Sequence, residues 1–329
     1  MRRRQFLSVL SGAALAWPLA ARAQQGERLR RVGMLIVAYP QTDPEAQTRI
    51  AAFLDTFQKL GWADGRNIRI EYHWGAGGAD RARAAASELV RSKPDVIVAS
   101  SNPGLEEVRK LTSTIPVVFT QISDPVGNGF VGSMARPGGN MTGFQNFEPA
   151  MGGKWLGVLK EAAPNMTRTG VLVGDNLTNM AFLRVAQAVA PSLGVKLVTI
   201  DLNHDGEVER AVAALAGEPD GGLLVLPNPY TAKNRDSIIV LAARHRLPAV
   251  YPFRFFAAAG GLMSYGIDQI DQWRRAASYV DRILRGEKPG ELPVQAPTKF
   301  ELVVNIKTAK AIGLNIPPAF PLRADEVIE

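Results

Sequence analysis

The chain has 329 residues, of which 46% are hydrophobic and 21% charged, and it contains no cysteine. This length predicts two domains, and the composition is that of an ordinary globular protein, not a disordered or fibrous one. The lack of cysteine excludes disulfides, cysteine-ligated metals and a lipid-anchoring cysteine. The formal net charge is +7, but no lysine and arginine cluster beyond the N-terminus would follow a phosphate backbone, so we expect no nucleic-acid partner.

Residues 1–23 have the features of an export signal. A basic start precedes an apolar stretch from Phe6 to about Ala16, and an A-x-A cleavage pattern ends at Ala23. The apolar stretch is too short to span a membrane. The twin-arginine type is favoured by Arg3-Arg4-Gln5-Phe6-Leu7, and an ordinary Sec signal is the alternative. Cleavage would remove four arginines and no acid and so lower the net charge from +7 to +3. We expect an exported, unanchored protein in a bacterial periplasm.

Strand and helix patterns alternate from Arg31 onward. Buried or alternating apolar runs predict strands at residues 32–38, 67–74, 95–100 and 115–121. Amphipathic or capped segments predict helices at 44–60, at 80–92 with Asp80 as the cap, and after Asn102-Pro103. Such alternation is typical of a parallel sheet with helices on both faces.

The stretch 124–143 contains a formal G-x-G-x-x-G pattern at 127–132. A dinucleotide site needs a long helix to begin at the last glycine, with the pyrophosphate on its N-terminus. Pro137, Gly138 and Gly139 would end such a helix within about two turns, and a strand-like run follows at 141–146. We therefore expect no nucleotide cofactor. The stretch is interpreted as a loop and short helix that carry Asp124 toward a cleft, followed by a strand.

The pattern then starts again in the second half of the chain. Strands are predicted at 170–174, 196–202, 221–227 and 247–253, and helices at 180–193, 207–217 and 237–245. Segments 93–103 and 218–229 both contain Pro-Asp, a buried strand and Asn-Pro, and each is followed by a strand led by proline. This approximate repeat favours two similar lobes. Chance likeness between ordinary strand–helix units is the alternative.

The tail is predicted to be shared between the lobes. It holds a long amphipathic helix at Gln269–Leu284, a Gly/Pro-rich connector, a strand at 300–305 and a short helix at 307–314. We expect one lobe to comprise residues 28–145 plus about 267–290, and the other 146–266 plus about 291–329. The chain would then cross between the lobes about three times. The fold class is α/β, with two similar doubly wound parallel-sheet lobes and a ligand cleft between them.

In open α/β sheets ligands bind beyond the carboxyl ends of the strands, and two such lobes would share one cleft. The candidate ligand-binding residues at these positions are Tyr39, Ser101, Asn102, Asp124, Asn176, Asn228, Phe253 and Tyr265. Helix N-termini near Asn102 and Asn228 could bind a carboxylate. Asp124 could bind an ammonium group, and the rings could cover an apolar or aromatic side chain.

Each candidate also has an ordinary structural interpretation. Asn102 and Asn228 are good helix caps in any protein, and Asp124 before Pro125 suits the start of a turn. Tyr39, Phe253 and Tyr265 could be packing residues. No H-E-x-x-H, G-x-S-x-G or P-loop pattern occurs, and we expect no enzymatic activity, no metal site and no cofactor.

Two long segments together resemble a known family. Residues 115–144 carry D-P-V, P-G-G-N-M-T-G and the spacing between them; residues 261–317 carry Y-G before a helix, I-L-R-G-E-K-P, L-P-V, a strand ending in Asn305 and I-G-L. The chain looks like the ABC-transporter substrate-binding proteins that include tryptophan- and tyrosine-type binding proteins, over roughly Arg31 to Ile328. Many members are lipoproteins, and a chain without cysteine departs from that.

The resemblance implies a type I periplasmic binding fold and an exported receptor. Such a receptor closes on a small solute by hinge motion and delivers it to a membrane permease. We expect a monomer that binds an amino acid or a similar polar solute. Two alternatives stay open: a periplasmic sensor that acts through a signalling partner, and a periplasmic enzyme on the same scaffold.

Overall fold

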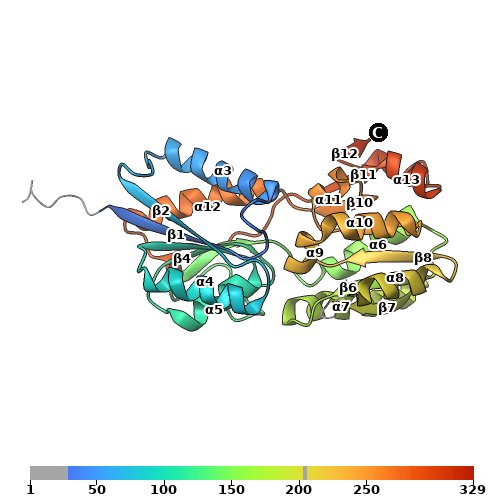
Figure 1. The fold of residues 1–329 in the computed structure, drawn as a ribbon, viewed down its shortest axis with the longest axis horizontal. Helices are drawn as coiled ribbons and strands as arrows, with labels where there is room; N and C mark the ends of the chain where they lie inside the picture. Colours follow the sequence, from blue (N-terminus) through green and yellow to red (C-terminus); the bar gives the residue numbers. More distant parts are fainter. Residues whose placement is uncertain (1–28, 203–205) are drawn as a thin grey trace, which may run out of the picture.

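The structure is a computed structural model that describes residues 29–202 and 206–329. Two α/β lobes lie side by side, as Figure 1 shows. The expected export signal at residues 1–23 lies outside the described residues. None of the helices within the described ranges is long and apolar enough to cross a membrane.

The first lobe is built on a five-stranded parallel sheet in the order β2-β1-β3-β4-β5. Its strands are β1 (Arg30–Ile36), β2 (Ile68–Trp74), β3 (Val96–Ser100), β4 (Val117–Ile122) and β5 (Met141–Gln145). The central strands β3 and β4 are buried along their whole length. Their nearly continuous apolar runs reflect a sheet that is covered on both faces.

Helices cover both faces of this sheet. They are α3 (Pro44–Lys59), α4 (Ala79–Arg91), α5 (Asn102–Leu111) and, from much later in the chain, α12 (Gln269–Leu284). Helices α4 and α5 pack together on one face, and α3 packs along α12 on the other (Figure 1). Trp273 of α12 makes an edge contact with Phe53 of α3 at a ring distance of 6.5 Å. The α12 helix therefore belongs to the core of the first lobe.

The second lobe is built on a seven-stranded sheet in the order β12-β11-β10-β9-β8-β6-β7. Its strands are β6 (Arg168–Val173), β7 (Lys196–Asp201), β8 (Gly221–Val225), β9 (Ala249–Tyr251), β10 (Met263–Gly266), β11 (Glu301–Asn305) and β12 (Glu326–Ile328). Only the β10–β11 pair is antiparallel among the described pairs of this sheet. The chain returns to this lobe after α12 without a crossover helix inside the lobe, so β11 can enter in the opposite direction.

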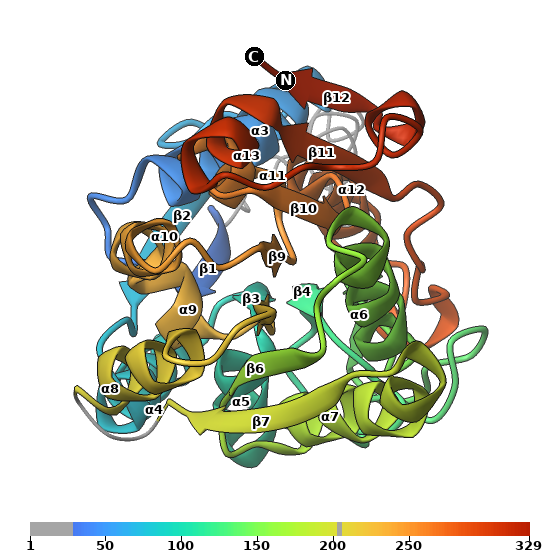
Figure 2. The same cartoon turned by 90° about the vertical axis from the view of Figure 1, so that its right-hand side faces the viewer.

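The helices of the second lobe also lie on both faces of its sheet. They are α6 (Met151–Ala162), α7 (Leu177–Val189), α8 (Glu207–Ala216), α9 (Pro229–Lys233), α10 (Arg235–Arg244), α11 (Arg254–Ala258) and α13 (Ile306–Ile312). Figure 2 shows α8 and α10 on one side of the strands and α6 on the other. Short 3₁₀ turns occur at Ala190–Leu193, Pro289–Glu291 and Pro321–Arg323.

The predicted fold class is confirmed: two α/β lobes, each with a mainly parallel sheet, face each other. Most predicted elements are present within one or two residues of the expected ends, and α12 has the predicted bounds. The helix α3 begins where expected because Asp43 caps it, accepting the amide of Glu45 at 2.9 Å, with Pro44 in the first turn.

Several local expectations are wrong. Asp80 does not cap α4, because the cap position is Gly78 and Asp80 lies inside the helix. The predicted helix at 180–193 begins earlier, at Leu177, because Asn176 caps it, and its last turn is 3₁₀ around Pro191. No helix forms in the glycine-rich stretch 124–139, which consists of turns, bends and irregular backbone.

The helix α6 and the strand β12 were not predicted. The α6 segment contains Gly152, Gly153 and Gly157, and glycine disfavours helices. Tertiary packing stabilises it instead: Gly152 lies directly against the backbone of Phe182 in α7, where a side chain would collide. The local sequence therefore does not predict α6, because this helix depends on its contact with α7.

Candidate functional site

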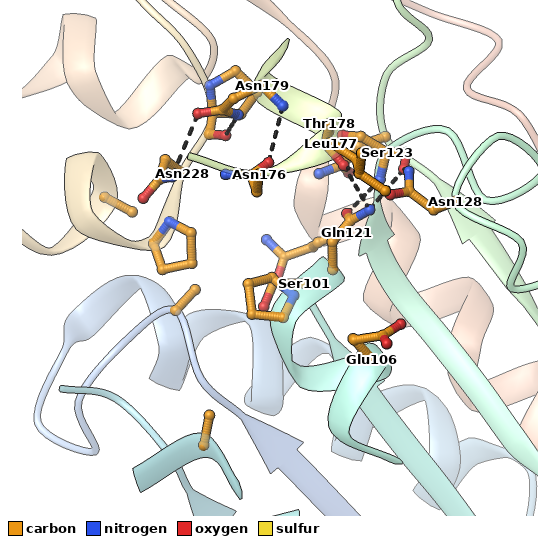
Figure 3. A pocket seen from close by; sticks show the side chains of 18 of the residues that line it. Ser101, Glu106, Gln121, Ser123, Asn128, Asn176, Leu177, Thr178, Asn179 and Asn228 are labelled. Carbon is orange, nitrogen blue, oxygen red and sulfur yellow. Dashed lines mark hydrogen bonds between the residues drawn. The ribbon is translucent and has the colours of Figure 1, made fainter. Parts of the chain in front are cut away.

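A cavity of about 450 Å³ lies between the two lobes. Its lining residues follow the carboxyl ends of strands in both sheets. The first lobe contributes Tyr39 after β1, Ser101 and Asn102 after β3, Gln121 near the end of β4 and Asn146 after β5. The second lobe contributes Asn176 to Asn179 after β6 and Pro227 and Asn228 after β8. Figure 3 shows Asn176, Asn179 and Asn228 across the space from Ser101 and Gln121. Parallel strands that all end at one edge bring these distant segments together.

The structure places six of the eight candidate residues in the wall of this cavity. They are Tyr39, Ser101, Asn102, Asn176, Asn228 and Phe253. Asp124 and Tyr265 are not among its lining residues.

Asp124 contributes to its own turn instead of the cavity wall. Its backbone is left-handed, with φ of 46°, and its carboxylate Oδ1 accepts the amide of Gly127 at 3.0 Å. Gly127 packs so tightly on this carboxylate that a side chain there would collide with it. The glycine at 127 thus serves the turn, and the expected ammonium-binding role of Asp124 finds no support in its position.

Tyr265 lies within β10 and contributes to packing. Its ring packs at 5.8 Å from that of Phe300, and its carbonyl accepts the indole N–H of Trp155 at 2.7 Å. The packing interpretation of Tyr265 is therefore the one that these contacts support.

Ser101 is the most unusual residue of the cavity wall. It precedes α5 with φ of 67° and ψ of 151°, and its side chain makes no capping hydrogen bond. Its residue is 9% exposed, and its hydroxyl has no hydrogen-bond partner among the described residues. Strained backbone and an unpaired buried polar atom both occur preferentially at functional sites.

Asn102 does not cap α5, since it is the first residue of that helix. Its Oδ1 accepts the amide of Ser123 at 2.9 Å, and its Nδ2 donates to the Ser123 carbonyl at 2.9 Å and to the Thr178 hydroxyl at 3.0 Å. Thr178 belongs to α7 of the second lobe. Asn102 therefore joins the ends of β3 and β4 and contacts the opposite lobe.

Asn176 and Asn228 do act as caps. Oδ1 of Asn176 accepts the amide of Asn179 at 2.9 Å, and Oδ1 of Asn228 accepts the amide of Tyr230 at 2.8 Å. Capping uses only the oxygens of these side chains. Nδ2 of Asn228 makes one long contact, 3.4 Å to Oδ1 of Asn179, so this amide has donor capacity left for a ligand.

Two aromatic residues form the apolar part of the wall. Tyr39 is 2% exposed, and the Arg49 guanidinium lies 4.8 Å from the centre of its ring. Burial raises the pKa of Tyr39 above its usual value, so its hydroxyl stays protonated at neutral pH and can donate as well as accept. Phe253 packs between Phe147 and Phe255, each at a ring distance of 5.5 Å.

Sequence reasoning missed a set of polar lining residues. These are Glu106, Gln121, Asn128, Asn146, Thr178, Asn179 and Gln269. Asn146 follows β5 and Gln121 is the last residue but one of β4, so a rule that selects residues at strand ends could have found them. Gln269 begins α12, and nothing in its local sequence connects it with strands that lie more than a hundred residues earlier.

Charged lining residues lie on α5 and are paired with one another or with neighbours. Glu106 binds Arg109 at 2.8 Å, and Glu107 binds Lys110 at 2.9 Å. The remaining polar lining consists of hydroxyls and carboxamides, which hydrogen-bond a ligand without proton transfer. The described residues contain no cluster of His, Cys, Asp or Glu that could hold a metal ion.

Two groups of polar contacts join the lobes beside the cavity. One is the bond from Asn102 to Thr178, and Thr178 also donates to Oδ1 of Asn128 at 3.4 Å. The other is an ion pair between Asp43, which caps α3, and Arg235, which begins α10, at 2.7 Å. Burial lowers the pKa of Arg235, but the hydrogen bond and charge of Asp43 outweigh this and raise it. Both contacts require the lobes to be close together.

Comparisons with known proteins agree with this architecture. The model of a family described as ABC transporter substrate binding protein matches residues 37–328. A tyrosine-binding protein of Clostridioides difficile (strain R20291) is 25% identical over 286 residues, which cover 85% of this chain and 79% of that protein.

Solved structures share the fold over nearly the whole chain. A conserved domain protein from Vibrio cholerae is 28% identical, with a TM-score of 0.82 and coverage of 91% of this chain and 100% of that one. An ABC domain from Streptococcus pneumoniae in complex with L-Trp is 24% identical, with a TM-score of 0.80 and coverage of 91% and 99%. The ligand-free, open structure of a Clostridium difficile substrate binding protein with adhesive properties is 23% identical, with a TM-score of 0.65 and the same coverage.

Proposed function

Because the chain belongs to the ABC transporter substrate-binding protein family, we propose that it is the solute receptor of an ABC importer. It binds a small polar solute between its lobes and delivers it to a membrane permease. The work of transport would then be done by that permease and its ATPase, and this chain would bind its solute without transforming it.

The observation that carries the proposal is the cavity itself. It is lined by strand ends of both lobes, and it holds buried polar atoms without partners, including the hydroxyl of Ser101. A buried polar atom costs free energy unless a partner satisfies it. A solute that bridges the lobes would supply the partners and favour the closed arrangement.

We propose an amino acid, aromatic or similar in size, as the solute. The named relatives support this class: one is a tyrosine-binding protein, and another was solved with L-Trp. In this chain the N-terminus of α5 would bind the carboxylate, because the first amide groups of a helix have no partner within it and the helix dipole favours an anion. Ser101 stands at that N-terminus with a free hydroxyl.

Hinge closure is the mechanism that we propose for capture. One lobe would comprise residues 28–145 plus about 267–290, and the other 146–266 plus about 291–329. The hinge would then consist of three crossings of the chain. The first lies between β5 and α6, the second between β10 and α12, and the third between the connector and β11. The TM-score is higher with the tryptophan complex, 0.80, than with the open relative, 0.65, at nearly equal identity. This difference and the two contacts between the lobes support a closed arrangement here.

The proposed location is the periplasm, reached by way of the N-terminal signal. The proposed protein is a monomer without a lipid anchor, since the sequence offers no cysteine for lipidation. No nucleic acid is proposed as a partner.

Ligand-dependent thermal stability tests the proposed function. A solute present at 100 times its dissociation constant adds about 2.7 kcal/mol to the free energy of unfolding. We expect a shift of the melting temperature with one or a few L-amino acids, and none with amine analogues that lack the carboxylate, such as tyramine.

A matched variant tests the carboxylate site. Ser101→Ala removes the hydroxyl but keeps a side chain at the same backbone conformation. We expect about ten-fold weaker binding with an unchanged melting temperature of the free protein, because the lost hydrogen bond is to a charged group.

If no L-amino acid shifts the melting temperature of the wild-type protein, the proposed solute class is wrong.

A further inference from the structure

The carboxyl end of β4 contains an irregularity that reshapes the cavity wall. Between Phe119 and Ile122 the pairing with β5 shifts, since Phe119 pairs with Gly143 but Ile122 pairs with Gln145. One extra residue therefore lies in β4, and Gln121 within it has φ of 58°. Such bulges bend a strand and re-aim a side chain, often beside a functional site.

The bulge is held in place from outside the sheet. Gln272 of α12 accepts the backbone amide of Gln121 at 3.2 Å and donates to the carbonyl of Gln145 at 2.7 Å. Gln272 thus satisfies the two backbone groups that the broken ladder leaves without a partner strand. The left-handed backbone of Gln121 is therefore held by hydrogen bonds from α12, and it is not the frayed end of a strand.

Three carboxamides meet the cavity near this bulge, and each carries an unpaired polar atom. Gln121, Asn146 and Gln269 line the cavity and are 7%, 3% and 6% exposed. Among the described residues, Oε1 of Gln121, Oδ1 of Asn146 and Nε2 of Gln269 have no hydrogen-bond partner. For Gln121 and Asn146, turning the amide over would leave a nitrogen unpaired instead of an oxygen.

The orientation of Gln269 is settled by its neighbour. Its Oε1 accepts from the guanidinium of Arg49, and an arginine has only donors. The Nε2 group of Gln269 is therefore free to donate. The three side chains together offer at least one donor and, as oriented, two acceptors.

This group extends away from the proposed carboxylate site along the edge of the sheet. Ser101 follows β3, and Asn146 follows β5, two strands away in the sheet order. Neighbouring strands are about 4.8 Å apart, so Gln121, on the intervening strand β4, lies about 5 Å from Ser101 along the sheet edge, and Asn146 lies about 10 Å from it. That distance is comparable with the length of an aromatic amino acid from its carboxylate to the far edge of its ring.

We propose that Gln121, Asn146 and Gln269 form a polar subsite that selects solutes whose far end both donates and accepts hydrogen bonds. A phenol hydroxyl or a carboxamide has this property, whereas a plain hydrocarbon end would leave the three amides unpaired. The proposal rests on the proposed function, since it assumes that the carboxylate of an amino acid lies at the α5 N-terminus.

The test compares solutes that differ only at their far end. Titration calorimetry of the wild-type protein is done with L-tyrosine against L-phenylalanine and with L-glutamine against L-methionine. In whichever pair fits the cavity, we expect the polar-ended member to bind at least about 10-fold to 100-fold more tightly, because sites built to hydrogen-bond a ligand reject analogues that lack the group.

Variants of the subsite residues then test whether the subsite causes the preference for the polar-ended solute. Gln121→Met keeps an unbranched side chain of similar length and the same backbone strain, and we expect it to weaken the polar-ended solute about ten-fold while leaving the apolar one nearly unchanged. Asn146→Ala should likewise reduce the ratio between the two members. Gln187→Met, at an exposed position of α7, is the matched control and should keep the wild-type ratio.

The outcomes separate the two proposals. Equal binding of both members of a pair by the wild-type protein overturns the subsite and leaves the proposed function standing. A wild-type preference that Gln121→Met and Asn146→Ala both retain, with melting temperatures close to that of the wild type, also overturns the subsite. Failure of all four amino acids to bind overturns the proposed amino-acid solute and the subsite with it.

Discussion

Single residues with left-handed backbones mark the edge of the first sheet that faces the cavity. Ser101, Gln121 and Asp124 have φ of 67°, 58° and 46°. These conformations cost free energy in residues other than glycine and persist only where surrounding contacts hold them. Two of the three line the cavity with unpaired polar atoms, whereas Asp124 forms a closed turn. A left-handed backbone alone therefore does not mark a residue of the cavity wall, whereas a left-handed backbone together with an unpaired polar atom does so for Ser101 and Gln121.

Glu71 provides a test of pH dependence at the residue scale. Its carboxylate accepts from Arg31 at 2.8 and 3.0 Å. Burial raises its pKa, but the hydrogen bonds and charge of Arg31 outweigh this, so the pKa lies below its usual value. A lowered carboxyl pKa contributes stability above the usual value near 4.5, and this contribution is lost as the pH falls through the lowered pKa.

We expect Glu71→Gln to lower the free energy of unfolding at pH 7 by about 1 kcal/mol. The difference between variant and wild type should shrink as the pH falls below about 4.5. Urea unfolding at pH 7, 5, 4 and 3 measures this, with exposed Glu88→Gln on α4 as the control. A difference that stays constant over this range would contradict the assigned cause.

At the scale of elements, packing between helices decides where α6 lies. The α6 segment has weak helix propensity because of its glycines, yet it packs along α7 in close contact. A Cβ at Gly152 would meet the backbone of Phe182, whereas a Cβ at Gly157 would meet nothing within 4 Å. Gly152 is therefore needed for the close contact between α6 and α7, whereas Gly157 only weakens the helix propensity.

Alanine substitutions should separate these roles. Gly157→Ala is expected to stabilise the protein by about 0.5–1 kcal/mol, because alanine favours the helix and no contact is disturbed. Gly152→Ala is expected to destabilise it by about 1–3 kcal/mol, because α6 and α7 must move apart. Thermal unfolding of both variants measures the difference, and two stabilising substitutions would show that the α6–α7 contact is looser than described.

At the scale of the whole molecule, contacts between the lobes are expected to set how tightly a solute is held. The Asp43–Arg235 pair has side chains that are only 7% and 15% exposed and lies outside the cavity wall. Under the proposed hinge motion it would stabilise only the closed arrangement, since opening would separate α3 from α10. A pair of this kind changes affinity by shifting the population of the closed state.

We expect Arg235→Gln to weaken solute binding about 10-fold to 100-fold, mainly through faster dissociation, because it leaves Asp43 buried without a counter-charge. Asp43→Asn keeps a good cap for α3 while removing the charge. Stopped-flow binding of both single variants and of the double variant measures the coupling. Additive effects in this cycle would mean that the two residues act independently and that the pair does not hold the lobes together.

The sequence by itself determined the fold class and six of the residues that line the cavity. Alternating strands and helices specify parallel sheets, and residues just after the strands, such as Tyr39, Ser101 and Asn228, must then lie at the binding edge. These conclusions follow from local patterns and from a rule that holds for all such sheets. The repeated Pro-Asp, strand, Asn-Pro pattern similarly predicted two lobes, which the structure has.

Only the tertiary structure decided which polar groups meet across the lobes. Gln269 reaches the cavity because α12 returns to pack along α3, and Asn102 meets Thr178 because the two lobes lie against each other at this point. Asp124 is not among the lining residues, and its carboxylate instead accepts the amide of Gly127 within its own turn. Local patterns cannot specify such contacts, since they depend on where segments distant in the chain pack and on which hydrogen bonds those segments leave unpaired.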